Sequence, residues 1–557
     1  MGLTGRALAW TITATSVTGF SLFGYDQGLM SGLITGDEFN QEFPGTKKKS
    51  DDDRHATVVQ GAVTACYEIG CFFGAIFVLL AGNYTGRKPL IVSGSVIIIV
   101  GTVISVASFK DSWGTGQFVI GRVITGIGNG LNTATIPVWQ SEMSKAEKRG
   151  MLVSFEGSVV AVGTMIAYWI DFGFSFINSS VQWRFPVAFQ IVFAALLFVG
   201  IINLPDSPRW LLANNRKEDA YKVLGALNNV DPHDDEVIAE ATVITEAINR
   251  FKNSQVGLRE LFAGGKSQHF ARMVIGSSTQ FFQQFTGCNA AIYYSTVLFQ
   301  DTIFNGEELK RTLALVLGGV FSTIYALFTI PSFFLVEKVG RRNLFLIGAT
   351  GQAISFTITF GCLVRASESN DYANGAAVGL FLFICFFAFT ILPLPWIYPP
   401  EINPLRTRTL ATAVSTCTNW LTNFAVVMFT PIFIKDGGNR GWGCYLFFAL
   451  LNYIFIPVIF FFYPETAGRS LEEIDIIFAK AYVDGAMPWR VAATMPHLSL
   501  EQQKEQGFSL GLFDDIEKEE GEQRVHDLLE KNDSSVEKND SSGDSNSNKP
   551  PMVDSNV

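Results

Sequence analysis

The segment NYTGRK, residues 83–88, follows the second long apolar stretch of the chain, and a related segment, EKVGRR, residues 337–342, follows the eighth. Both lie between stretches of roughly 20 apolar residues, the length that a helix needs to cross a bilayer. Apolar residues make up 48% of the 557 residues and charged residues only 17%, against about a quarter in soluble proteins. The composition predicts an all-α integral membrane protein. Its twelve expected spans are residues 8–33, 58–80, 89–108, 116–137, 151–173, 185–204, 272–300, 312–336, 343–364, 376–400, 409–434 and 442–463.

A second pair of residues repeats in register with these loops. Glu142 precedes Arg149 by seven residues after the fourth span, and Glu401 precedes Arg408 by seven residues after the tenth. Two such repeats predict a duplicated six-helix unit with a site between its halves, as in many secondary transporters. The predicted parts are an N-terminal bundle (1–207), a cytoplasmic helical linker (208–270), a C-terminal bundle (271–463) and a cytoplasmic tail (464–557) with an amphipathic start and a disordered end.

The charge of the connecting loops predicts the orientation in the membrane. The loops after even-numbered spans carry many Lys and Arg residues, such as Lys88 and Arg342, and positive loops stay in the cytoplasm. Both termini are therefore expected inside the cell. Asn178, in FINSSVQW, is then the single Asn-x-Ser/Thr sequence on an expected outer loop and is a candidate for glycosylation.

Several function classes lack their signatures in this sequence. The seven cysteines fall within or at the edge of spans and form no disulfide or zinc pattern. There is no nucleophile–base set, metal cluster or phosphate-binding loop. We therefore expect no enzymatic activity, no metal or other cofactor, and no nucleic-acid partner.

An acidic residue interrupts the first span. Asp26 lies in SLFGYDQGLMSG, where a carboxylate facing lipid would cost several kcal/mol. Arg122 lies one or two turns inside the fourth span and is the candidate partner of Asp26, although an arginine at that depth can also snorkel to the interface. Glu156 in the fifth span is close enough to the inner end to be structural, and its role stays open.

The seventh span contains an unusual number of uncharged polar side chains. One helical face holds Gln280, Gln283 or Gln284, and Gly287, and another face holds Asn289 and Tyr293. A helix broken near Gly287 would bring both sets to one cavity. Amides donate and accept hydrogen bonds without charge, which suits a neutral, hydroxyl-rich solute; alternatively, such amides join helices to one another.

The tenth span predicts a second break. LPLPWIYPPE, residues 392–401, contains four prolines, and broken backbone at membrane depth is tolerated only around a cavity or within protein. Trp396 lies at this break. Asn419 and Trp420 in the eleventh span are further site candidates, although Trp420 is equally compatible with simple packing.

In combination, these segments resemble the sugar porters of the major facilitator superfamily over residues 1–480. The matching pieces are FGYDQG, GRK, GRR, LPDSPRWL, QQFTGCNAAIYY and YPETAGRSLEEID. Residues 55–77, the seventh span and residues 460–482 are similar, more narrowly, to proton-coupled glycerol symporters of the yeast plasma membrane. The resemblance implies a multi-pass transporter in the lipid bilayer of the plasma membrane, with protons and glycerol or another small polyol as its partners.

The resemblance also implies a role for each matching residue. Asp26 would carry the proton and pair with Arg122. The substrate would bind to Gln283, Gln284, Asn289, Trp396, Asn419 and Trp420. Tyr293 and Tyr294 would form the outer gate, and the inner gate would consist of Arg87, Glu142, Arg149, Glu337, Arg341, Glu401 and Arg408.

Four positions depart from the family pattern. Gly157 replaces a glutamine of hexose porters, Tyr325 an asparagine, and Leu392 a glycine, while Asn83 replaces an aspartate of the inner gate. A site with two fewer amides and a bulky tyrosine should hold a hexose poorly. We therefore expect proton-coupled uptake of glycerol. The alternatives are a proton-coupled or facilitative hexose or polyol transporter and a transporter-like nutrient receptor.

Overall fold

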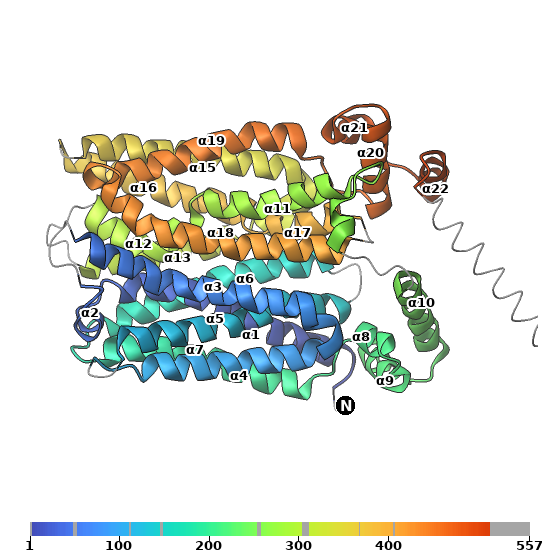
Figure 1. The fold of residues 1–557 in the computed structure, drawn as a ribbon, viewed down its shortest axis with the longest axis horizontal. Helices are drawn as coiled ribbons and strands as arrows, with labels where there is room; N and C mark the ends of the chain where they lie inside the picture. Colours follow the sequence, from blue (N-terminus) through green and yellow to red (C-terminus); the bar gives the residue numbers. More distant parts are fainter. Residues whose placement is uncertain are drawn as a thin grey trace, which may run out of the picture.

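The computed structural model describes residues 3–47, 53–110, 113–144, 149–252, 258–303, 311–366, 368–404 and 407–512. Two helical bundles lie side by side, with their long helices running in one common direction (Figure 1). The N-terminal bundle contains α1 (Gly5–Leu33), α3 (Arg54–Thr85), α4 (Arg87–Val106), α5 (Thr115–Glu142), α6 (Arg149–Phe174) and α7 (Val181–Asn203).

The C-terminal bundle repeats this plan with three broken spans. Its continuous helices are α15 (Arg341–Arg365), α18 (Arg408–Asp436) and α19 (Trp442–Phe462). The broken spans are α11 (His269–Phe285) with α12 (Cys288–Val297), α13 (Arg311–Phe328) with α14 (Ser332–Val339), and α16 (Asn370–Phe386) with α17 (Leu394–Ile402). These helices confirm the predicted twelve-span, all-α fold.

Each break has a local cause. Gly287 has a φ of 92°, which is left-handed and favours glycine, and it separates α11 from α12 as predicted. A π-helical turn at Phe387–Ile391 precedes Pro393 and joins α16 to α17, so the predicted break in the tenth span is also present. The break before α14, next to Pro331, was not predicted.

The spans differ in their apolar character. Nine helical segments among the described residues are long and apolar enough to cross a membrane by length and composition. The three remaining spans are α1, α5 and the α11–α12 pair. α1 and α5 carry Asp26 and Arg122, whereas α11 and α12 are each shorter than a full span because the chain breaks between them.

Glycines bring α3 and α5 into close contact. A Cβ atom at Gly70 or Gly74 would lie 2.3 Å from a backbone oxygen of α5, and one at Gly126 or Gly130 would lie 2.1 or 2.2 Å from a backbone oxygen of α3. Small residues allow such backbone approach between helices in a membrane. The contact holds Tyr67 of α3 beside Arg122 of α5.

The two ends of the molecule carry different elements. At one end, which we call the linker end, lie the N-terminus, the linker helices α8 (Pro208–Ala213), α9 (Lys217–Asn228) and α10 (Asp235–Lys252), and the tail helices α20 (Leu471–Val483), α21 (Pro488–Thr494) and α22 (Leu500–Ser509) (Figure 1). The other end carries α2 (Asp37–Glu42), and we call it the α2 end.

The predicted linker and tail helices are present. In α20, Ser470 and Glu473 form a capping box, which fixes the start of the helix. The low-complexity end of the tail lies outside the described residues. The four-part division of the chain stays a prediction.

Hydrogen bonds join the two bundles toward the α2 end. Ser31 of α1 donates to Thr296 of α12 over 3.1 Å, and Tyr168 of α6 bonds to the Ser295 hydroxyl over 2.6 Å. Arg311 of α13 donates to the Gly32 carbonyl over 3.4 Å. These contacts hold the α2 end closed.

Candidate functional site

Asp26 and Arg122 meet in the interior of the N-terminal bundle, as the sequence predicts. Both guanidinium nitrogens of the Arg122 fork bond to the carboxylate, and the Nη2–Oδ2 distance is 3.1 Å. Each side chain is only 1% exposed. The Arg122 cation also lies 4.7 Å from the centre of the Tyr67 ring. A two-pronged pair of this kind has fixed geometry, and its burial makes removal of either partner costly.

A second acidic residue, Glu68 of α3, lies near this pair and was missed in the sequence. Its side chain is fully buried, and it accepts a hydrogen bond from the Tyr293 hydroxyl of α12. Because Tyr293 belongs to the other bundle, this bond joins the halves inside the molecule. The signal in the sequence was a lone acid in CYEIGCFF, which had no recognisable partner.

The break between α11 and α12 gathers four amides into one network. Gln284 donates to the side-chain oxygen of Asn419 on α18. Asn289 donates to Gln284 over 2.5 Å and to Asn423 over 2.6 Å. All four are buried. Asn423 was missed, although it lies four residues after Asn419 and therefore on the same face of α18.

Other amides of α11 bond to the backbone instead. Gln280 donates to the Pro395 carbonyl over 2.7 Å, and Gln283 donates to the Leu392 carbonyl over 3.1 Å. Both acceptors lie at the break in the tenth span, where carbonyls lack their helical partners. The helix-joining interpretation therefore describes Gln280 and Gln283 in this structure, although Gln283 was predicted as a substrate ligand.

The two predicted tryptophans differ in their surroundings. Trp420 is fully buried, and its ring packs edge-on against Phe23 of the N-terminal bundle with centroids 5.3 Å apart. Its indole N–H has no hydrogen-bond partner among the described residues. Trp396 is partly exposed at the start of α17. Trp420 therefore lies between the bundles, with a free donor.

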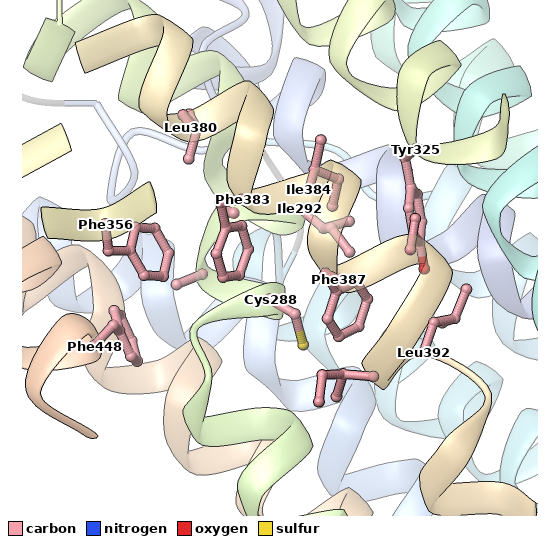
Figure 2. Close-up of a cluster of buried hydrophobic side chains, with 14 of the residues drawn as sticks. Cys288, Ile292, Tyr325, Phe356, Leu380, Phe383, Ile384, Phe387, Leu392 and Phe448 are labelled. Atoms are coloured by element: carbon pink, nitrogen blue, oxygen red, sulfur yellow. The ribbon is translucent and has the colours of Figure 1, made fainter. Parts of the chain in front are cut away.

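The two positions that were expected to limit substrate size converge on Leu392. A Cβ atom at Gly157 would lie 3.8 Å from the Leu392 side chain, which is ordinary contact. Tyr325 lies among buried apolar side chains, including Phe387 at a centroid distance of 6.0 Å and Leu392 (Figure 2). Tyr325 and Leu392 thus belong to one apolar cluster, and Gly157 lies beside that leucine.

The comparisons with known proteins decide the family. Residues 11–478 match the model of the family described as "Sugar (and other) transporter". The chain belongs to the sugar transporter family. It is 64% identical to the "Sugar transporter STL1" of Saccharomyces cerevisiae, over 94% of this chain and 91% of that protein. It is 31% identical to the "Low-affinity glucose transporter HXT3" of the same yeast, over 88% of this chain and 86% of that one.

Solved structures of transporters share the fold. The proton:xylose symporter XylE bound to 6-bromo-6-deoxy-D-glucose superposes with a TM-score of 0.70 at 25% identity, over 85% of this chain and all of that one. An inward-open structure of XylE from E. coli gives a TM-score of 0.65 at 25% identity, covering 84% of this chain and 99% of that one. The family member described here is therefore built like a known proton symporter.

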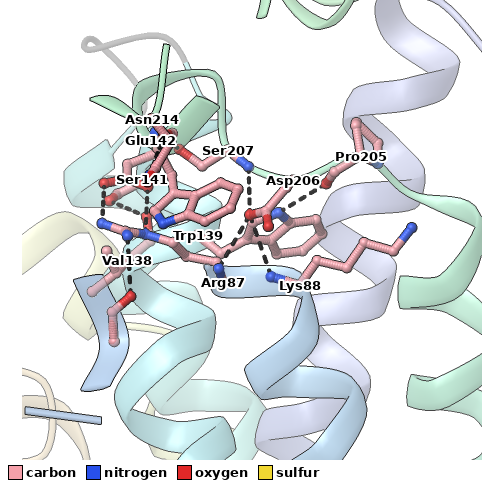
Figure 3. Close-up of polar contacts among 12 residues, drawn as sticks. Arg87, Lys88, Val138, Trp139, Ser141, Glu142, Pro205, Asp206, Ser207 and Asn214 are labelled. Carbon is pink, nitrogen blue, oxygen red and sulfur yellow. Dashed lines mark hydrogen bonds and ion pairs between the residues drawn. The ribbon is translucent and has the colours of Figure 1, made fainter. Parts of the chain in front are cut away.

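At the linker end, the transporter holds the first repeated loop with carboxylates. Arg87 pairs with Glu142 at 3.0 Å (Figure 3). The backbone N–H groups of Arg87 and Lys88 donate to Asp206 over 3.2 and 3.3 Å. Asp206 belongs to the LPDSPRWL segment that follows α7, and its role was not predicted.

The C-terminal half of the transporter repeats this arrangement. Arg341 pairs with Glu337 at 2.8 Å and with Glu401 at 2.9 Å. The hydrogen bonds from Arg341 hold the pKa of the Glu337 carboxyl below its usual value. The backbone N–H groups of Arg341 and Arg342 donate to Glu465 over 2.8 and 3.1 Å. The segments Pro-Asp-Ser (205–207) and Pro-Glu-Thr (464–466) are thus a third repeat, and their similarity was the overlooked signal.

The remaining predicted gate residues are placed differently or are not described. Tyr294 donates to the Val427 carbonyl over 2.9 Å within the C-terminal half. Arg408 donates to the Asn403 carbonyl over 3.3 Å, and the structure does not bring it to Glu401 among the described contacts. The side chains of Arg149 and Asn83 lie outside the described residues. Asn178 is exposed at the α2 end, between α6 and α7.

Proposed function

We propose that this member of the sugar transporter family imports glycerol or a similarly small polyol together with protons. The observation that carries the proposal is the buried Asp26–Arg122 pair next to a network of neutral amides. An acid whose neighbours favour neither form exclusively can bind and release a proton. Amides bind hydroxyl groups without competing for that proton. XylE, which shares the fold, is a proton:xylose symporter, and this similarity supports proton coupling.

Helix α1 connects the proton-binding residue Asp26 to the hydrogen bonds that close the α2 end. Asp26 and Ser31 are both on α1, and Ser31 bonds to α12, which also carries Asn289. Protonation of Asp26 weakens its attraction to Arg122, so α1 is released from α5. Movement of α1 would then loosen its bonds to α12, and the α2 end can open. Alternating access follows when the two bundles rock around the amide network.

The membrane potential is sufficient to drive accumulation. One proton that enters through a potential of about 100 mV releases roughly 2.3 kcal/mol. Since each 1.4 kcal/mol is a factor of about ten, this energy supports roughly 50-fold accumulation of a neutral solute. A pH gradient adds to this value.

Small substrate size is supported by the surroundings of Leu392. Gly157 and Leu392 carry no amide side chain, and Tyr325 is buried in the same apolar cluster as Leu392. A three-carbon polyol needs fewer partners than a hexose. The 31% identity to the glucose transporter HXT3 supports the alternative of hexose transport, and a facilitator that only equilibrates its solute is the other alternative.

We further propose a location in the plasma membrane with the linker end in the cytoplasm. The arginines of the two repeated loops, Arg87 and Arg341, lie at the linker end, and positive loops are retained inside. Both termini are then cytoplasmic, and Asn178 is outside.

The test is the pH of a weakly buffered suspension of yeast cells that express the protein and lack other polyol uptake. Addition of glycerol should make the medium more alkaline as protons enter, and glucose or a pentitol should do so less. Glycerol uptake without alkalinisation would favour a facilitator. Stronger alkalinisation with glucose would favour a hexose symporter, and signalling without any uptake would favour a receptor.

A further inference from the structure

Glu68 has one carboxyl oxygen that is paired and one that is not, among the residues that the structure describes. The side chain is fully buried on α3, and its Oε1 accepts the hydrogen bond from Tyr293. Its Oε2 is buried and has no hydrogen-bond partner among the described residues. Buried polar atoms in folded proteins nearly always have a partner, and a buried carboxylate needs one most. This oxygen is therefore available to accept a hydrogen bond from a bound ligand.

The surroundings of Glu68 indicate what kind of ligand this is. The carboxyl faces the C-terminal half, where the Tyr293 hydroxyl donates to Oε1 and the Asn423 side chain lies close by. Asn423 in turn accepts a hydrogen bond from Asn289, so Glu68 extends the amide network across the gap between the bundles. On its other side, the neighbouring residue Tyr67 lies under Arg122. Glu68 is thus placed between the Asp26–Arg122 pair and the amide network.

We propose that Glu68 is a substrate-binding residue whose Oε2 accepts a hydrogen bond from one hydroxyl of the polyol. This inference rests on the proposed function and names a further contact of the same site. In the closed structure the Tyr293 hydroxyl donates a hydrogen bond to Oε1. The substrate hydroxyl would donate the missing hydrogen bond to Oε2. The polyol would then touch both bundles at once, because Glu68 belongs to one bundle and the amides belong to the other.

This contact explains how a small polyol can be bound without the amides that hexose porters use. The carboxyl supplies a hydrogen-bond acceptor in place of the amides that are absent at Gly157 and Tyr325. Specificity for a short polyol would thus come from one anchor on α3 together with the amides of the C-terminal bundle.

The test combines a variant with substrates that lack one hydroxyl. Glu68→Gln keeps the shape and the acceptor for the Tyr293 hydroxyl, but it places an NH₂ donor where Oε2 would accept the substrate hydroxyl. Purified protein in proteoliposomes would be assayed by exchange without a proton gradient, so that coupling through Asp26 does not enter the measurement. The KM for glycerol should rise about 5- to 10-fold, with the maximal rate changed less than two-fold. For 1,2- or 1,3-propanediol, whichever lacks the contacting hydroxyl, the variant should have the KM of the wild type.

Glu156→Gln is the matched control, because Glu156 is a buried carboxyl of the same bundle without a hydrogen bond or ion pair among the described residues. It reports the general effect of deleting a buried acid, and thermal unfolding of each variant reports folding. An unchanged glycerol KM in Glu68→Gln would overturn the assignment, as would an equal rise for glycerol and both propanediols. Absent exchange in the wild type would overturn the proposed function as well, so the two failures are distinguishable.

Discussion

Asp26 and Arg122 neutralise each other in a region where either charge alone would be costly. Both side chains are 1% exposed, and the fork geometry leaves little freedom to the pair. Breaking a buried pair by removing one partner typically costs about 3–5 kcal/mol, because the other charge stays behind. The pair can therefore act as a switch only if a proton, and not a structural change, removes the negative charge.

Replacement of Asp26 by Asn should abolish uphill accumulation of glycerol and spare exchange. The variant imitates the protonated acid permanently, so the bundles can rock but no proton is carried. Labelled glycerol accumulation and counterflow would be measured in the same proteoliposomes. Full accumulation by a well-folded Asp26→Asn protein, at neutral external pH, would contradict the role of Asp26 as the proton carrier.

The pair Gly157→Gln and Tyr325→Asn tests the origin of size selectivity. Gly157→Gln alone should obstruct the site, since its side chain would extend toward Leu392. Tyr325→Asn alone should destabilise the apolar cluster by about 3–5 kcal/mol, as other large-to-small changes do. Together the two changes supply amides and space, and glucose should then compete with labelled glycerol about 5- to 150-fold more strongly. No gain in a folded double variant would show that these positions do not set substrate size.

Single residues also mark the limit of what the sequence could predict. The Asp26–Arg122 pair was predictable because each is a conspicuous charge in an apolar span. Glu68 was equally conspicuous, but its partner is the hydroxyl of Tyr293, and nothing in a sequence pairs an acid with one tyrosine among many. The position of Arg408, which bonds to a nearby carbonyl, likewise depends on packing that residue spacing does not encode.

At the scale of helices, the broken spans position the site. The break at Gly287 turns Asn289 toward Gln284, and the break before α17 exposes the carbonyls that receive Gln280 and Gln283. Glycine and the prolines made these two breaks predictable. The π-helical turn before Pro393 was not predictable from residue types, whereas Pro331 was an overlooked signal for the break before α14.

Gly287→Ala should disrupt the α11–α12 junction. A Cβ atom there would lie 2.8 Å from a ring atom of Phe448, and the φ of 92° is unfavourable for alanine by about 1–2 kcal/mol. The melting temperature of the purified protein should fall and glycerol exchange should be lost. Gly361→Ala in α15 is the matched control, since nothing lies within 4 Å of its added Cβ, and alanine favours a helix by about 0.5–1 kcal/mol. Equal stability of the two variants would contradict this account of the junction.

At the scale of the whole molecule, each bundle has one charged cluster at the linker end that joins its own helices. Hydrogen bonds join the two bundles to each other at the α2 end. The Arg87 cluster belongs to the N-terminal half and the Arg341 cluster to the C-terminal half. Each bundle can thus move as a rigid unit, and the contacts of Ser31, Tyr168 and Arg311 must separate when the α2 end opens.

Cysteines at Ser31 and Ser295 should lock the α2 end. The two hydroxyl oxygens lie 3.5 Å apart on opposite bundles, so a disulfide between cysteines placed there is compatible with the closed structure. In a background without native cysteines, oxidation should stop glycerol exchange, and a reductant should restore it. Each single cysteine serves as the control. Normal exchange by a fully oxidised double variant would show that these contacts persist throughout transport.

The separation of Asp26 from Arg122 along the chain also has a consequence for biosynthesis. The two residues are 96 positions apart, so a ribosome that adds roughly 5–20 residues per second makes the arginine about 5–20 s after the acid. During this interval α1 enters the membrane with its carboxyl unpaired, and α1 is among the spans with the weakest apolar character. Its insertion therefore depends on later helices, and an Arg122 variant would be exposed to cellular quality control before it ever met its substrate.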